Sequence, residues 1–242
     1  MFMLAFVFSV VSLSGYEIMS NTYNRPLPES SKSTVKMVIK KGGDERVRKI
    51  QSYTKREGDI RKTLIRFLEP ADVRGAGFLQ IENEKEKGET EQFLYLTSLK
   101  RTRRIASSDK ASSFMGSELT YEDMERKKPD DYENKLIEET ENTYIVESTP
   151  KPGKETQYSK IKSWVRKDFF IVKTEIYDKD KKLLKVVEFK DIEPIDGFLT
   201  ARNVIVKNVQ NGNITIMQIQ EIDNKADIKS NIFTKQYLER GF

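Results

Sequence analysis

Short β-prone segments follow one another along most of the chain, and this repetition is the feature that most limits its fold. Residues 35–39 alternate between apolar and polar side chains, and Gly42-Gly43-Asp44 then provides a turn into the segment 47–54. Asn211-Gly212 lies between two further segments of the same kind. Alternation with a period of two is typical of strands, and Asn-Gly or Gly-rich pairs are typical of tight hairpin turns. The pattern predicts a mainly β protein with antiparallel strands.

The number of these segments indicates one large sheet. About ten of them lie between residues 35 and 223, which suits a large, twisted antiparallel sheet that curls. Residues 16–30 predict a short helix that ends before Pro26, because proline cannot continue a helix. The 242 residues, 37% of them hydrophobic, can bury a core, and no change in composition marks a linker. We therefore expect a single domain over residues 16–242.

The first fourteen residues are uncharged and mostly apolar. They are too few to span a bilayer and match the apolar region of a signal peptide, with the small residues Ser14 and Gly15 at the expected cleavage point. We predict that residues 1–15 are removed on export and that the product acts in the periplasm; a buried N-terminal strand is the alternative. The sequence has no cysteine, so we expect neither disulfides nor a lipid anchor on an N-terminal cysteine.

The amino-acid composition lacks the residue types that most enzymes use for catalysis. The sequence contains neither histidine nor cysteine, so the commonest general base, metal ligand and thiol nucleophile are missing. Ser107 lies three residues before Lys110, the spacing of a serine–lysine nucleophile pair, but no accompanying motif follows. A polar loop is the better interpretation, because Ser and Asp gather in turns. We expect no enzymatic activity, no cofactor and no metal site, and we rank a serine–lysine hydrolase last among the alternatives.

The most specific stretch is residues 99–124, LKRTRRIASSDKASSFMGSELTYEDM, where a basic strand leads into a small polar loop and then an acidic end. Together with FLEPADV at 67–73, FLYL at 93–96 and YLER at 237–240, it resembles the outer-membrane lipoprotein-sorting protein family, the LolA-like group of periplasmic carriers. The resemblance implies an open half-barrel with short helices in its concave mouth. It also implies a carrier that binds a lipid, or the acyl chains of a lipoprotein, and transfers it between membranes, with an inner-membrane exporter and an outer-membrane acceptor as partners.

Large apolar side chains on successive strands and on the loop after the basic stretch are the candidate ligand contacts. In an ordinary sandwich they would be core, but a half-barrel has no second sheet to fill its concave side. We therefore predict an apolar cavity lined by Phe78, Phe93, Tyr95, Phe114, Met115, Trp164, Phe169, Ile171 and Phe198. The alternative function is a periplasmic or surface interaction module whose interior is filled by its own side chains.

Arg101, Arg103 and Arg104 form a basic stripe beside the predicted mouth. In a strand, Arg101 and Arg103 share one face and Arg104 lies on the other. One hypothesis places them at the cavity rim, against a lipid head group or a lid, and the other makes them edge protection or partners of nearby acids. The 43 basic residues are interspersed with 38 acidic ones for a net charge of +5, so we do not expect nucleic-acid binding.

Overall fold

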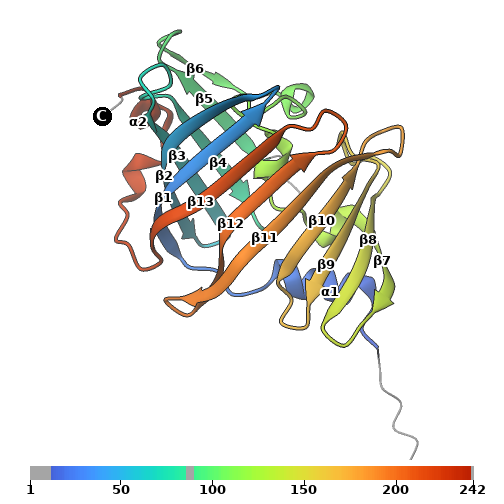
Figure 1. The fold of residues 1–242 in the computed structure, drawn as a ribbon. Helices are drawn as coiled ribbons and strands as arrows, with labels where there is room; N and C mark the ends of the chain where they lie inside the picture. The colour runs from blue at the N-terminus through green and yellow to red at the C-terminus, as the bar shows by residue number, and fades with distance from the viewer. Residues whose placement is uncertain (1–11, 86–89, 241–242) are drawn as a thin grey trace, which may run out of the picture.

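A computed structural model describes residues 12–85 and 90–240, and one antiparallel sheet of thirteen strands dominates it (Figure 1). The first half of the chain forms β1 (Ser30–Lys41), β2 (Asp44–Glu57), β3 (Ile60–Glu69), β4 (Gly77–Asn83), β5 (Glu91–Leu96) and β6 (Arg101–Arg104). The second half forms β7 (Tyr132–Glu139), β8 (Thr143–Pro150), β9 (Lys160–Arg166), β10 (Ile171–Tyr177), β11 (Leu183–Ile195), β12 (Phe198–Asn208) and β13 (Ile214–Asp223).

The strand order is β6-β5-β4-β3-β2-β1-β13-β12-β11-β10-β9-β8-β7. Strands adjacent in sequence therefore pair as hairpins, with one exception. β6 and β7 follow each other in the chain but lie at opposite edges of the sheet. The residues that connect them, 105–131, must cross one whole face of the sheet, and we call them the crossing segment.

The face under the crossing segment, here called the inner face, holds most of the core. Leu119 of the crossing segment packs against apolar clusters of both sheet halves, one containing Phe67 and Phe78 and the other containing Val187 and Val206. The helix α1 (Gly15–Tyr23) lies on the same face near the β7 edge, and its Ile18 packs against strands β8 and β9. Both sheet halves are thus covered by chain on the inner face (Figure 1).

Within residues 12–85 and 90–240, the opposite, outer face is covered at one end by the C-terminal segment. The helix α2 (Lys235–Arg240) buries Leu238 against β3, β4 and β5. Arg66, which is 2% exposed, donates hydrogen bonds to the backbone carbonyls of Tyr237 and Leu238. A side chain at Gly77 would place its Cβ 2.7 Å from Leu238, so glycine allows the helix to pack this closely. These contacts place the YLER stretch directly against the glycine of β4.

The structure corrects the sequence-based expectations in two places. Thirteen strands replace about ten, partly because a turn at Glu141-Asn142, which the sequence does not mark with glycine or proline, divides residues 132–150 into the hairpin of β7 and β8. The sheet twists but is not strongly curled (Figure 1). The helix expected within 16–30 is confirmed as α1, which ends at Tyr23. The signal peptide predicted for residues 1–15 lies mainly outside the described residues, and no described helix is long and apolar enough to cross a bilayer.

Candidate ligand cavity and adjoining polar chamber

Phe114 fills the inner face over the first half of the sheet. Its side chain is 1% exposed, and its ring centroid lies 5.2 Å from that of Phe78, 5.7 Å from Tyr121 and 6.1 Å from Phe67. Edge-to-face contacts at these distances stabilise aromatic clusters. Met115, which follows with a φ of 52°, packs on the edge of the same cluster. The loop that was predicted to line the ligand cavity therefore forms an aromatic plug over the first half of the sheet.

Two acids hold the crossing segment against the middle of the sheet. The Glu118 carboxylate accepts hydrogen bonds from the side chains of Asn208 (2.9 Å) and Asn213 (3.0 Å), at the turn between β12 and β13. Asp123 accepts from the Tyr158 hydroxyl at 2.8 Å and forms an ion pair with Lys185. The acidic end of the specific stretch thus attaches the plug to the strands beneath it.

The Asp123–Lys185 pair is buried, with 9% and 3% of the two side chains exposed. Burial by itself would raise the pKa of Asp123, but the Lys185 ammonium and the hydrogen bond from the Thr120 backbone outweigh it, and the pKa lies below its usual value. A buried charge without such a partner is costly. The pair therefore acts as a fixed attachment of the crossing segment.

An apolar cavity of about 290 Å³ lies over the second half of the sheet, between α1 and the inner face of β8 to β11. Its lining includes Met19 and Tyr23 of α1, Leu27, the strand residues Tyr132, Ile161, Ser163, Ile171 and Phe189, and Phe169 and Phe170 of the turn between β9 and β10. Its volume is near the lower end of the range for small-molecule sites, about 300–1,000 Å³. Of the residues predicted to contact ligand, it brings together Phe169 and Ile171.

The helix α1 is fixed over this cavity by its first turn. Ser14 is the N-cap, and its side chain accepts a hydrogen bond from the Glu17 backbone while Glu17 bonds back, forming a capping box. A Cβ at Gly15 would lie 2.5 Å from the Asn134 carbonyl oxygen, so only glycine lets the helix contact β7 this closely. The cap therefore lies at the residues where cleavage was expected.

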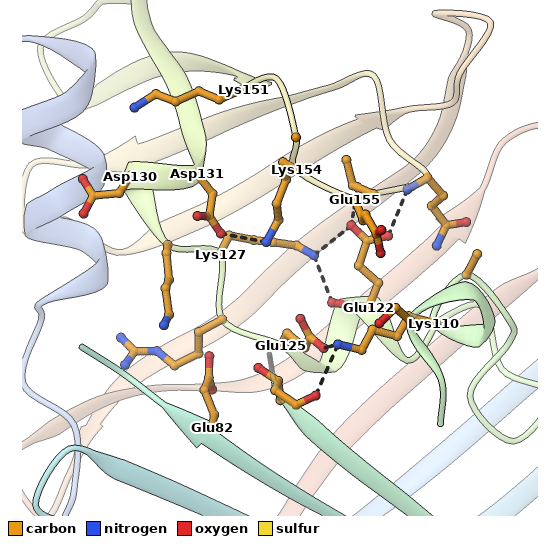
Figure 2. A pocket seen from close by; sticks show the side chains of 18 of the residues that line it. Glu82, Lys110, Glu122, Glu125, Lys127, Asp130, Asp131, Lys151, Lys154 and Glu155 are labelled. Atoms are coloured by element: carbon orange, nitrogen blue, oxygen red, sulfur yellow. Dashed lines mark hydrogen bonds and ion pairs between the residues drawn. The ribbon is translucent and has the colours of Figure 1, made fainter. Parts of the chain in front are cut away.

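A larger polar chamber of about 870 Å³ adjoins the cavity (Figure 2). Ion pairs cross or flank it, joining Lys110 to Glu125 (2.9 Å), Lys127 to Glu122 (3.5 Å) and Lys154 to Asp131 (2.7 Å). Ser107 and Lys110, the pair with nucleophile spacing, both line this chamber. The chamber is therefore built from charged groups, in contrast to the apolar cavity.

Arg126 and Lys127 line both spaces and so form their junction. The Arg126 guanidinium contacts the Glu84 carboxylate and the Tyr23 carbonyl, and lies 4.0 Å from the centroid of the Tyr23 ring. These contacts join the end of α1 to the crossing segment. Neither residue was predicted from the sequence to be functional. The signal that could have indicated them is the basic run 126–128, which follows shortly after the specific stretch 99–124.

Glu82 is the chamber residue with the most perturbed environment. It is 2% exposed, and burial raises its pKa to about 7, with nearby Arg126 acting in the opposite direction. Its position follows from strand alternation, because Phe78, Gln80 and Glu82 all lie on the inner face of β4. This buried acid was also missed by the sequence analysis.

The other predicted contacts lie elsewhere. Phe93 and Tyr95 face the outer side, packed under the C-terminal segment. Trp164 is on the outer side of β9, with the ammonium groups of Lys162 and Lys173 at 5.1 and 4.2 Å from its ring. Phe198 begins β12, at the turn after β11. The large apolar residues that were predicted to line one cavity therefore lie in different places, which include the aromatic plug, the cavity and the outer face.

The three arginines of the basic stripe are exposed on the edge strand β6. Arg101 and Arg103 pair with residues of β5 that face the inner side, and Arg104 pairs with Phe93. Arg103 interacts with the Tyr121 hydroxyl, and Arg104 lies 3.8 Å from Glu91. The described linings of the cavity and of the chamber contain none of the three.

Solved structures similar to this chain carry the same fold. One is a DUF1329 family protein from Desulfovibrio piger, which is 31% identical with a TM-score of 0.85, over 93% of this chain and 97% of that one. Another is a putative outer membrane lipoprotein-sorting protein domain from Vibrio parahaemolyticus, which is 28% identical with a TM-score of 0.86, over 93% and 98%. A LolA superfamily protein from Nitrosomonas europaea shares the fold at 20% identity and a TM-score of 0.69, over 93% and 100%.

A family model also matches most of the sequence. A family model that is described only as "-like: Uncharacterized protein" matches residues 59–240. That range contains the crossing segment, the polar chamber and eleven of the thirteen described strands, all except β1 and β2. No curated protein matches the chain.

Proposed function

This chain belongs to the DUF1329 family and has the LolA-like fold of outer-membrane lipoprotein-sorting protein domains, and from that premise we propose that it is a non-enzymatic carrier. Its ligand would be a lipid, or the acyl chains of a lipoprotein, held in an apolar cavity and passed between membranes. Such a carrier would bind its ligand on the inner face of the sheet, since α1 and the crossing segment cover that face.

The observation that carries the proposal is the apolar cavity of about 290 Å³ beneath α1. Each ligand methylene moved from water into such a space contributes roughly 0.8 kcal/mol, so a short length of acyl chain supplies useful affinity without any covalent chemistry. Phe169 and Ile171 are the proposed ligand contacts among the residues selected from sequence. Release would then depend on competition by an acceptor or on movement of α1.

We propose that the carrier acts in the periplasm, between an inner-membrane exporter and an outer-membrane acceptor, after removal of residues 1–15. The support is the uncharged apolar sequence of residues 1–14 and the fold it precedes. Intact-mass analysis of exported protein tests this: a mass lacking about fifteen residues is expected. A folded cytoplasmic product that retains Met1 would contradict export.

The main test of the carrier is to fill its cavity. Ser163 is 1% exposed and lines the cavity from β9, so Ser163→Phe places a ring where ligand would bind. Displacing two methylenes costs roughly 1.6 kcal/mol, so we expect binding of a fluorescent fatty acid to weaken about tenfold. The control is Lys162→Phe, which adds a ring to the outer side of the same strand.

Native mass spectrometry of the protein purified from cells, followed by denaturing extraction, provides an independent measurement. Co-purified lipid is expected in the parent protein and should be reduced in Ser163→Phe but not in Lys162→Phe. A parent protein that carries no lipid and binds no fluorescent fatty acid would contradict the carrier. Melting temperatures of both variants show whether a loss of binding comes from loss of the fold.

A second candidate is a protein-interaction module, favoured by the aromatic plug. Phe114, Phe78 and Tyr121 already fill the inner face over the first half of the sheet, as expected of a module with a closed core. This module would carry no lipid and would present its charged faces to a protein partner. Lipid content in the experiment above separates it from the carrier.

The rim role of the basic stripe stays a prediction. If Arg101, Arg103 or Arg104 contacts an anionic head group, its Gln variant should change transfer of labelled lipid to acceptor vesicles, because guanidinium binds phosphate in a bidentate geometry. Exposed ion pairs contribute only about 0–1 kcal/mol, so fold stability should not change. Parent-like transfer by all three variants would make these arginines ordinary surface charge.

A further inference from the structure

The buried carboxyl of Glu82 opens onto the polar chamber without a bonding partner. Its neighbour on the same face, Gln80, receives a hydrogen bond from Gln92 at 2.9 Å and donates one to the Met124 carbonyl at 3.0 Å. Glu82, by contrast, forms no hydrogen bond or ion pair with any residue in 12–85 and 90–240, although it is 2% exposed. A buried acid in this state lacks the N–H or O–H donors that normally compensate its burial.

The chamber's cations are largely neutralised by other acids. Lys110, Lys127 and Lys154 are paired with Glu125, Glu122 and Asp131, and Arg126 contacts Glu84. Lys128 donates to the Asn83 carbonyl at 2.6 Å. Among the chamber residues that the structure describes, Glu82 is therefore a deeply buried acid that forms no ion pair. Glu82 lies close enough to Glu125 for the two carboxyl groups to interact, and Figure 2 shows both among the side chains that line the chamber.

A ligand could reach this acid and the apolar cavity at once. The two spaces adjoin at Arg126 and Lys127, which line both. An ammonium group offers a compact positive charge with three N–H donors, which meets the missing requirements of a buried carboxylate. A molecule with an apolar chain and an amine at one end therefore matches the paired spaces in chemistry.

We propose that Glu82 is the recognition group of a subsite for a primary ammonium group, carried on the ligand whose apolar chain occupies the cavity beneath α1. The proposal rests on the carrier function proposed above and names the head-group chemistry of its ligand. Glu82 would bind the ammonium directly, with Arg126 held away by Glu84 and the Tyr23 carbonyl.

Four probes test this subsite by calorimetry at pH 8 with the full chain: decylamine, decanol, decanoate and butylamine. We expect decylamine to bind about tenfold more tightly than decanol, because a charge-assisted hydrogen bond adds to burial of the same chain. Decanoate should bind more weakly than decanol. Butylamine should bind much more weakly than decylamine, and binding comparable to that of decylamine would contradict occupation of the cavity by the apolar chain of the ligand.

The substitution Glu82→Gln should remove the preference for decylamine and leave decanol binding unchanged. Glu45→Gln makes the same change at an exposed acid on β2 and should leave both affinities at parental values. Decanol binding without an amine preference, or an equal preference in Glu82→Gln, would overturn the subsite while leaving the carrier in place. If no ten-carbon probe binds, the carrier proposal fails and the subsite falls with it.

A pH series on the parent protein avoids reliance on a variant. The groups that act on Glu82 are Arg126 and Lys128, which favour its ionised form, and Glu84 and Glu125, which oppose it together with burial. Since burial raises the Glu82 pKa to about 7, decylamine affinity should fall as the pH is lowered from 8 to 6, while decanol affinity stays constant. Amine binding that does not vary over this range would contradict a role for Glu82.

Discussion

The strongest stability prediction concerns the ion pair that attaches the crossing segment to β11. Replacing Lys185 with Met removes the ammonium but leaves Asp123 buried, with only the Tyr158 hydroxyl and Thr120 to bond it. Both side chains of the parent pair are at least nine-tenths buried, so solvent screens the pair little. Breaking a buried pair from one side costs about 3–5 kcal/mol. We expect this loss in the free energy of unfolding of Lys185→Met.

Urea denaturation of four variants, Lys185→Met, Asp123→Asn, the double variant and Lys190→Met, measures the prediction. The double variant Asp123→Asn/Lys185→Met should be less destabilised than the sum of its single changes by about 0.5–3 kcal/mol, because residues in contact are not additive. Lys190→Met is the matched control on the same strand, since Lys190 and Glu188 are paired with 48% and 44% of their side chains exposed. That control should lose at most about 1 kcal/mol.

The pH dependence of the same variant has a definite sign. Folding lowers the pKa of Asp123, so the pair stabilises the protein above the unfolded value of 3.8 and this stabilisation is lost on acidification. The difference between parent and Lys185→Met should therefore shrink as the pH falls toward 3. A loss below about 1 kcal/mol at pH 7, or additive single changes, would refute the view that this pair fixes the crossing segment.

Three further outcomes follow from the packing. Phe114→Ala should lower the free energy of unfolding by about 3–5 kcal/mol in urea, because it empties the centre of the aromatic plug; a loss below 1 kcal/mol would mean the plug is loosely packed. In full-length protein that retains residues 1–15, Gly15→Ala should lower the melting temperature and fatty-acid binding together, since its Cβ would lie 2.5 Å from the Asn134 carbonyl oxygen, and parental values would disprove the close contact of α1. Because folding raises the pKa of Glu82, this acid should reduce stability as the pH rises from 4.5 to about 7, and melting curves of Glu82→Gln should lack that component.

The hairpins could be predicted because their signals are local. Gly42-Gly43 and Asn211-Gly212 do join paired strands, since positive φ at these glycines favours such turns. The hairpin of β7 and β8 was missed because Glu141-Asn142 has no glycine or proline to mark it. No local sequence signal could predict that β6 and β7 lie at opposite edges of the sheet, because strand order depends on contacts between residues that are distant in sequence.

The candidate site could be predicted only in part. The alternation of residues along a strand assigns side chains to the two faces of the sheet, but it does not show which segment packs on each face. Phe93 and Phe169 are similar in sequence context, yet one packs under the C-terminal segment and the other lines the cavity. Outer-face burial by residues 226–238 could not be foreseen from strand patterns. Arg126 and Glu82 were missed because their importance comes from burial and from neighbours far away in sequence.

The pairing of β1 with β13 has a consequence for how the chain assembles. This central seam joins Lys32 to Asp223, so it forms between the two ends of the described sheet sequence, whereas hairpin partners lie close together along the chain. Contacts of such long range slow folding, and chains of this length commonly pass through intermediates. The two meanders, β1 to β6 and β7 to β13, can each collapse locally before the seam closes. Until then β1 and β13 are unpaired edges, open to strands of other molecules. Ordered assembly thus depends on the last strand reaching the first before another chain does.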